Sequence, residues 1–213
     1  MSAANDPVAI AAALSELGSA TLGESGGRAA HRRLRPAWFG ARIAAPAYPV
    51  GCTPGDNLAV HVAVTRAPQG SVLVVDVGQV ADRGYWGEVL TTGAEAAGLA
   101  GLVLDGGVRD VAALEAHGFP VFSSTIALTG ASKDKPGTVG SPVRVGGVEV
   151  AAGDWVVADV DGVTFVPAAA LDDVIAAGRN REEKEAGFFE ALRSGSTTVE
   201  LLDLDASLIR EGA

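Results

Sequence analysis

The sequence predicts an α/β fold with a central parallel βαβ part, antiparallel hairpins after it and a long C-terminal helix. Buried-strand runs alternate with helical segments in the middle of the chain, as in parallel sheets with crossover helices. Turn signals then follow in quick succession at Gly146-Gly147 and Asp161-Gly162, which indicates antiparallel strands. The polar stretch from Ala168 to about Arg193 predicts the last helix, although Gly178 and Gly187 weaken it.

Capping residues and apolar patterns place the elements in order. Asp6 and Pro7 suit the start of a helix that Gly18 ends, and residues 43–50 suit an extended segment. The elements expected next are a helix from Asp56 or Asn57 to about Thr65, a strand at 72–76, a helix at 86–97, a strand at 101–105, a helix at 110–117 and a strand at 120–122.

Length and composition indicate a single domain spanning residues 1–213, with 194–213 as a C-terminal tail. A chain of 213 residues can bury a large core without disulfides. Hydrophobic residues make up 48% of it but aromatic residues only 5%, so the core is expected to be aliphatic. Cys52 is the sole cysteine, which excludes an internal disulfide and a multi-thiolate metal site.

Charge and hydropathy exclude several partner classes. The formal net charge of −10 disfavours nucleic acid, because a negative field repels phosphate. No apolar run approaches the roughly 18 residues of a membrane span, and the N-terminus lacks the pattern of a signal peptide. We therefore expect a cytoplasmic protein with no membrane and no nucleic-acid partner.

Common catalytic motifs are missing from the sequence, including the P-loop, the dinucleotide-binding glycine motif, HExxH and CxxC. The three histidines, His31, His61 and His117, have no metal-ligand spacing and are interpreted as surface or core residues. The three lysines lie in polar contexts, which disfavours a Schiff-base enzyme because such a lysine needs desolvation. Carboxylates and an arginine near strand ends remain as candidates for chemistry.

Arg109 and Asp110 follow the expected strand 101–105, separated from it by Gly106-Gly107. Ligands of open α/β sheets bind at the carboxyl ends of strands, and the loop at 78–87 follows the preceding strand. The two loops are therefore expected to face each other across a site. An alternative remains open, in which Asp110 is only the N-cap of the next helix and Arg109 pairs with a surface acid.

Three segments together carry a resemblance to a known family: residues 84–90 (GYWGEVL), 98–110 (GLAGLVLDGGVRD) and 118–122 (GFPVF). Supporting runs lie at 54–57, 142–148 and 153–163, and the match extends from about residue 15 to 193. These segments resemble the RraA-like family, which includes the class II 4-hydroxy-4-methyl-2-oxoglutarate/4-carboxy-4-hydroxy-2-oxoadipate aldolases. The resemblance implies a swivelling β/β/α domain and homotrimers or hexamers with active sites between subunits.

The resemblance also implies roles for individual residues. Asp110 would bind Mg²⁺ or Mn²⁺, and Arg109 would stabilise the enolate formed from a small 2-oxo acid substrate. Glu88, where the aldolases usually have Asp, would be a catalytic carboxylate that orients a metal-bound water. The substrate-binding residues would be Gly87, Glu88, Val89, Leu90 and Arg109.

A carboxylate from the C-terminal helix of a neighbouring subunit is expected to complete the site, with Glu185 first and Glu182 and Glu183 as alternatives. The expected reaction is retro-aldol cleavage to pyruvate, accompanied by decarboxylation of oxaloacetate. The principal substrate stays open between the hydroxylated diacids and oxaloacetate. A different function is also open, in which the protein regulates ribonuclease E by binding it without catalysis.

Overall fold

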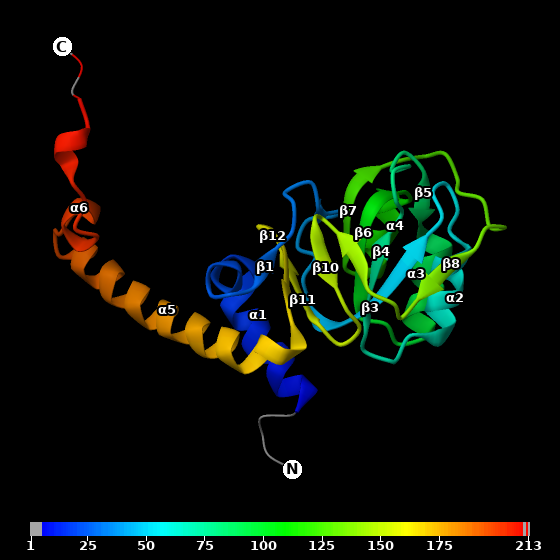
Figure 1. The fold of residues 1–213 in the computed structure, drawn as a ribbon, viewed down its shortest axis with the longest axis horizontal. Coiled ribbons are helices and arrows are strands. Elements are labelled where there is room, and N and C mark those ends of the chain that lie inside the picture. The colour runs from blue at the N-terminus through cyan, green and yellow to red at the C-terminus, as the bar shows by residue number, and fades with distance from the viewer. Residues whose placement is uncertain (1–5, 211, 213) are drawn as a thin grey trace.

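The computed structural model describes residues 6–210 and 212, and it contains one large mixed sheet (Figure 1). The strands are β1 (Arg28–Ala29), β2 (Arg35–Pro36), β3 (Ile43–Cys52), β4 (Val72–Asp76), β5 (Gly84–Trp86), β6 (Gly101–Val108), β7 (Val121–Ile126), β8 (Gly137–Val139), β9 (Val143–Val145), β10 (Val148–Val150), β11 (Trp155–Asp159) and β12 (Gly162–Val166). The α-helices are α1 (Pro7–Glu24), α2 (Leu58–Arg66), α3 (Glu88–Ala96), α4 (Val111–His117), α5 (Leu171–Arg193) and α6 (Thr198–Leu201).

The centre of the sheet is parallel and its flank is antiparallel. The strand order is β1-β12-β11-β3-β4-β6-β7-β2, with β5 beside β6 and β8 beside β3. Strands β3, β4, β6 and β7 pair in parallel, whereas β11 pairs antiparallel with both β3 and β12. The predicted α/β class, the βαβ centre, the hairpins and the long last helix are all confirmed.

The continuous apolar run of β4 arises because both faces of the sheet are covered. Leu73 and Val75 belong to the core cluster beneath helices α2, α3 and α4, whereas Val72 and Val74 face a second cluster. That second cluster is completed by residues of the β9–β10 hairpin and of β11 and β12. Successive side chains of a strand point to opposite faces, so one five-residue strand serves two cores.

Several expected boundaries were wrong. Helix α1 continues to Glu24, although Gly18 interrupts it with a positive φ of 75°. Trp86 was expected in a helix but ends β5, where it is buried and stacks on Phe119 with a centroid distance of 6.0 Å. Strand β6 runs on to Val108 with an irregularity in its pairing between Leu104 and Gly107, so the two glycines lie inside the strand and not in a turn after it.

Helix α5 is unbroken through both glycines and extends away from the sheet (Figure 1). Its buried residues, Val174 and Gly178, lie in its first part, which packs on α1. A Cβ at Gly178 would lie 2.9 Å from Leu17 Cδ1, so glycine lets the two helices approach closely. From residue 179 onward every described residue of α5 is exposed or partly exposed.

Asp56 ties helix α2 to the loop that follows β7. Its buried carboxylate accepts hydrogen bonds from the amides of Leu58, Asp134 and Lys135 and from the hydroxyl of Ser132, at 2.7 to 3.1 Å. Burial raises the pKa of Asp56, but these donors outweigh it and hold the pKa far below its usual value. The folded state therefore favours the charged carboxylate, and its stabilisation is lost as the pH falls below the usual aspartate pKa of about 4.

Replacing Asp56 with alanine is expected to lower the free energy of unfolding by about 3 kcal/mol at pH 7, because several buried donors lose their acceptor. The deficit is expected to shrink below about pH 4, because the carboxylate of the unfolded wild-type chain then binds a proton while that of the folded chain does not. Urea unfolding at pH 7 and pH 3.5 measures both effects. The matched control is Asp134→Ala, which removes an exposed carboxylate from the same loop; an equal loss in both variants would contradict the account.

Candidate functional site

A pocket of about 190 Å³ lies beside the N-terminus of α3. Its walls come from the β5–α3 junction, the end of β6, the start of α2 and the loop after β7. The lining residues are Asn57, His61, Gly84, Tyr85, Trp86, Gly87, Val89, Leu90, Arg109, Asp110, Gly130, Ala131 and Lys133. The pocket therefore contains both residues of the predicted Arg-Asp pair and three of the four predicted residues at 87–90.

Arg109 and Asp110 lie together at the C-terminal end of β6. The Arg109 Nε atom is 3.8 Å from Asp110 Oδ2, and both side chains are about two-fifths exposed. Gly84 makes room for the arginine, because a Cβ there would lie 3.2 Å from the Arg109 Cδ atom. A cationic fork and a carboxylate thus share one solvent-accessible wall of the pocket.

Asp110 occupies the N-cap position of α4 but does not act as its cap. Within the described chain its carboxylate makes no hydrogen bond to α4, and its backbone is left-handed at φ 57° and ψ 36°. The carboxylate instead accepts a hydrogen bond from the Glu88 amide at 3.1 Å. A left-handed aspartate costs energy that a simple cap would not require, so the geometry favours the site interpretation over the N-cap alternative.

The start of α3 supplies further backbone donors to the pocket. The first amides of a helix have no intrahelical partners and carry partial positive charge. The Glu88 amide donates to the Asp110 carboxylate, whereas the next two residues of the helix, Val89 and Leu90, line the pocket. An anionic group of a ligand can therefore bind at this helix end next to Arg109.

Glu88 lies at the edge of this arrangement. The described residues that line the pocket do not include it, and its Oε1 atom is 3.8 Å from His117 Nε2. His117 is held in turn by Glu95, whose Oε2 lies 2.8 Å from His117 Nδ1. The Glu88 side chain is 58% exposed, so it has space to change its conformation.

Tyr85 and Trp86, the last two residues of strand β5, anchor the pocket wall. The Tyr85 hydroxyl donates to the Val80 carbonyl at 2.5 Å and accepts from the Gly55 amide at 2.8 Å. Trp86 Nε1 donates to the Thr91 hydroxyl at 2.7 Å. These buried contacts fix strand β5 and thereby the position of Gly87 beside Asp110.

Asn57, His61 and Lys133 are pocket residues that the sequence-based prediction missed. His61 was interpreted as a surface or core histidine and Lys133 as a residue in a polar loop. The available signal was the spacing of Asn57 and His61, which puts them on one face of a helix that starts near the pocket. The loop after β7 contributes Gly130 and Ala131 to the same wall as Lys133.

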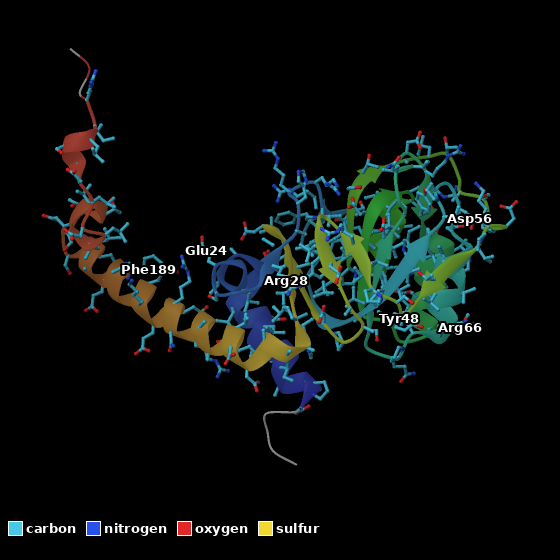
Figure 2. All side chains as sticks on the ribbon, in the orientation of Figure 1. Glu24, Arg28, Tyr48, Asp56, Arg66 and Phe189 are labelled. Atoms are coloured by element: carbon cyan, nitrogen blue, oxygen red, sulfur yellow. The ribbon has the colours of Figure 1, made fainter. Side chains whose placement is uncertain are left out.

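Glu185 does not reach the pocket of its own chain. Its Oε1 lies 2.8 Å from Arg181 Nε, and Arg181 also pairs with Glu24. Figure 2 shows Phe189, on the same helix, at the end of the molecule opposite Asp56, which precedes the lining residue Asn57. The alternatives Glu182 and Glu183 are exposed on the same stretch of α5.

Comparison with known proteins decides the family. The model of the RraA-like family, described as Aldolase/RraA, matches residues 11–165. The chain belongs to this family. The prediction from the sequence motifs is thereby confirmed, and the matched region contains every described residue of the pocket.

Relatives of this family share both sequence and fold with the chain. A candidate 4-hydroxy-4-methyl-2-oxoglutarate aldolase of Halalkalibacterium halodurans is 33% identical over 141 residues, which are 66% of this chain and 67% of the relative. An uncharacterised protein of Pseudomonas syringae superposes with a TM-score of 0.82 at 27% identity, over 91% of this chain and 92% of that one. Streptomyces coelicolor RraAS2, described as an unusual member of the RNase ES inhibitor RraA protein family, gives 0.72 at 27% identity, over 83% and 93%.

The donor set of this RraA-like chain suits a hard, largely hydrated cation. In the part of the chain that the structure describes, no three His, Cys, Asp or Glu side chains are placed to hold a metal ion. Zinc sites need three or four such ligands, whereas Mg²⁺ often takes one or two carboxylates and keeps its waters. The Asp110 carboxylate is a ligand of the type that Mg²⁺ and Mn²⁺ accept.

Cys52 is not among the described residues that line the pocket. Burial, with contributions from Asp56 and Asp76, raises the pKa of the Cys52 thiol to about 12, so Cys52 is not poised as a nucleophile. Among the helices at 6–210, none is both long and apolar enough to cross a membrane.

Gly87 is expected to be essential for the position of Asp110. A Cβ at Gly87 would collide with Asp110 Oδ2 and would lie 3.1 Å from Arg109 Cγ. The Gly87→Ala variant is therefore expected to lose at least about 10-fold in kcat, because a small displacement of a catalytic group lowers the reaction rate strongly. Gly93→Ala, on the same helix, serves as the control, because a Cβ there would make only an ordinary contact of 3.6 Å with Val64 Cγ1; equal activity of both variants would contradict this role.

Proposed function

We propose that this protein is a metal-dependent lyase that cleaves 4-hydroxy-4-methyl-2-oxoglutarate or a similar 2-oxo acid to release pyruvate, and that it also decarboxylates oxaloacetate. The observation that carries the proposal is the placement of Asp110 and Arg109 together in one pocket at the N-terminus of α3. Membership of the Aldolase/RraA family supports it, as do several relatives named as candidate aldolases of this substrate.

The residues of the pocket suit the two ends of a 2-oxo acid. The substrate's C1 carboxylate would accept hydrogen bonds from the free amides at the start of α3, at Val89 and Leu90. Arg109 would donate to the 2-keto oxygen and stabilise negative charge as it develops there. A Mg²⁺ or Mn²⁺ ion held by Asp110 would supply Lewis-acid polarisation of the same oxygen.

Both proposed reactions give the same product anion. In aldol cleavage the C3–C4 bond breaks, its electron pair forms the pyruvate enolate, and the C4 hydroxyl gives its proton to a water oriented by Glu88 as C4 becomes a carbonyl. In oxaloacetate decarboxylation the bond to the leaving CO₂ breaks and leaves the same enolate. Protonation at C3 then gives pyruvate in both cases, so one enolate-binding wall serves both substrates.

An assay of pyruvate release from 4-hydroxy-4-methyl-2-oxoglutarate tests this function, with Mg²⁺, with excess EDTA, and with Mg²⁺ restored. We expect activity that EDTA removes and Mg²⁺ restores. Undiminished turnover in EDTA would contradict the metal role, and no release of pyruvate from either substrate would contradict the lyase assignment.

We further propose that the protein assembles into trimers or hexamers in which α5 of one subunit brings Glu185 to the pocket of the next. From residue 179 onward no described residue of α5 is buried. This part of the helix nevertheless carries a large apolar side chain, Phe189, which is half exposed. Near the pocket, Val89, Ile126 and Leu128 are more than half exposed. Large apolar side chains exposed in this way suit contacts between subunits.

A Phe189→Glu substitution is therefore expected to shift the mass measured by light scattering toward that of a single chain, because a charge would be buried in the contact. The pyruvate-releasing activity is expected to fall with it. Glu190→Gln, an exposed change on the same helix at a residue outside the proposed site, controls for surface effects. A Phe189→Glu protein with unchanged mass would contradict this assembly.

A second candidate function is regulation of an RNA-processing enzyme by protein binding. The description of Streptomyces coelicolor RraAS2 favours it, and a net charge of −10 suits a basic partner. Binding to ribonuclease E in a pull-down, together with no lyase activity on either substrate, would support this function over the enzyme.

A further inference from the structure

Two buried polar atoms at the start of helix α2, on residues that line the pocket, have no hydrogen-bond partner among the described residues. The Asn57 side chain is 4% exposed, and its Nδ2 donates to the Tyr85 carbonyl at 2.8 Å, which leaves Oδ1 free. Asn57 Oδ1 and His61 Nε2 are the buried side-chain nitrogen or oxygen atoms that lack a hydrogen-bond partner among the described residues. Buried polar atoms are almost always paired in folded proteins, so two such atoms at one pocket indicate a missing partner.

The position of the two atoms indicates that this partner is a ligand of the pocket. Residues four apart on a helix lie on the same face, and both Asn57 and His61 line the pocket that contains Arg109 and Asp110. Asp56 fixes the start of α2 through its bond to the Leu58 amide, so the pair is held on a rigid element. A molecule bound by Arg109 would therefore extend toward Asn57 and His61.

The chemistry of the pair selects the group that it binds. Because the Asn57 amide nitrogen is already used, Oδ1 can only accept a hydrogen bond. Burial and the charge of Lys133 hold the pKa of His61 below its usual value, against an opposing effect of Asp56, so the imidazole is neutral at pH 7. An acceptor beside a neutral imidazole suits a hydroxyl, which can donate to one and accept from the other, whereas a carboxylate would be repelled by Oδ1.

We propose that Asn57 and His61 form a subsite for the C4 hydroxyl of the substrate and thereby make the pocket selective for 4-hydroxy-2-oxo acids over 2-oxo acids that lack this group. This inference rests on the function proposed above. The C4 hydroxyl must lose its proton during aldol cleavage, so a subsite that orients it favours that reaction. Oxaloacetate has no such hydroxyl and gains nothing from the subsite.

The test compares both substrates on His61 variants with Mg²⁺ present. His61→Phe keeps an aromatic ring but has no nitrogen, whereas His61→Gln keeps a hydrogen-bonding nitrogen close to the place of Nε2. We expect the ratio of kcat/KM for 4-hydroxy-4-methyl-2-oxoglutarate to kcat/KM for oxaloacetate to fall at least about 10-fold in His61→Phe, the size of one lost hydrogen bond. His61→Gln is expected to restore part of that ratio.

Thr65→Ala, one turn further along α2 and outside the pocket, is the matched control and should leave the ratio unchanged. Thermal unfolding of each variant separates a folding defect, which lowers both activities together, from a loss of selectivity. An unchanged ratio in His61→Phe would overturn the subsite and show that the two atoms bind only water. A wild-type protein inactive on both substrates would instead overturn the proposed function itself.

Discussion

Replacing Asp110 with alanine is expected to reduce pyruvate release by at least about 100-fold, in both the aldol and the decarboxylation assay. The carboxylate is the only acidic side chain among the described lining residues, and it would hold the cation that shares the developing charge of the enolate. Added Mg²⁺ is not expected to rescue this variant. Steady-state kinetics with both substrates over a range of Mg²⁺ concentrations measures the effect.

A glycine at the same position separates the catalytic role of Asp110 from a structural one. The left-handed backbone of Asp110 strains alanine but not glycine, so Asp110→Gly is expected to be more stable than Asp110→Ala by about 1 kcal/mol. Both variants are expected to be inactive. If Asp110→Gly were as active as the wild type, Asp110 would be only a residue of the β6–α4 turn.

Replacing Arg109 with lysine is expected to lower kcat by about 100-fold while the protein keeps its stability. Lysine preserves the positive charge but lacks the planar fork of donors that would stay on the 2-keto oxygen as it becomes an enolate. Arg83→Lys is a suitable control, because Arg83 is a partly exposed arginine beside the pocket whose Nη1 donates to the Gly130 carbonyl at 3.3 Å. Equal effects of the two substitutions would indicate that only the local charge matters.

The fold could be predicted from the sequence wherever a local pattern matched the final packing. Strand 72–76 is an apolar run because both of its faces are buried, and the Gly146-Gly147 turn was visible for the same local reason. Trp86 was placed in a helix because its neighbours at 88–96 are helical. Only the tertiary contact with Phe119 and the pairing of β5 with β6 show that it ends a strand.

The position of the candidate site, at the end of β6, was predictable from the sequence, but its geometry was not. The order of Arg109 and Asp110 after a buried strand, with the family motifs, pointed to the pocket wall. The left-handed turn that directs Asp110 to the Glu88 amide has no sequence signature, because aspartate is also a common N-cap. His61 was missed because a histidine on a helix is informative only when the structure shows what faces it.

The most direct test of the central claim is exchange of the methyl protons of pyruvate with deuterium in D₂O, followed by NMR. This measurement detects enolate formation without requiring knowledge of the full substrate. We predict exchange that depends on the wild-type protein and Mg²⁺, and that is lost in EDTA and in Asp110→Ala. Exchange at the same rate in Asp110→Ala, or no exchange with the Mg²⁺-loaded wild type, would contradict an enolate site at Arg109 and Asp110.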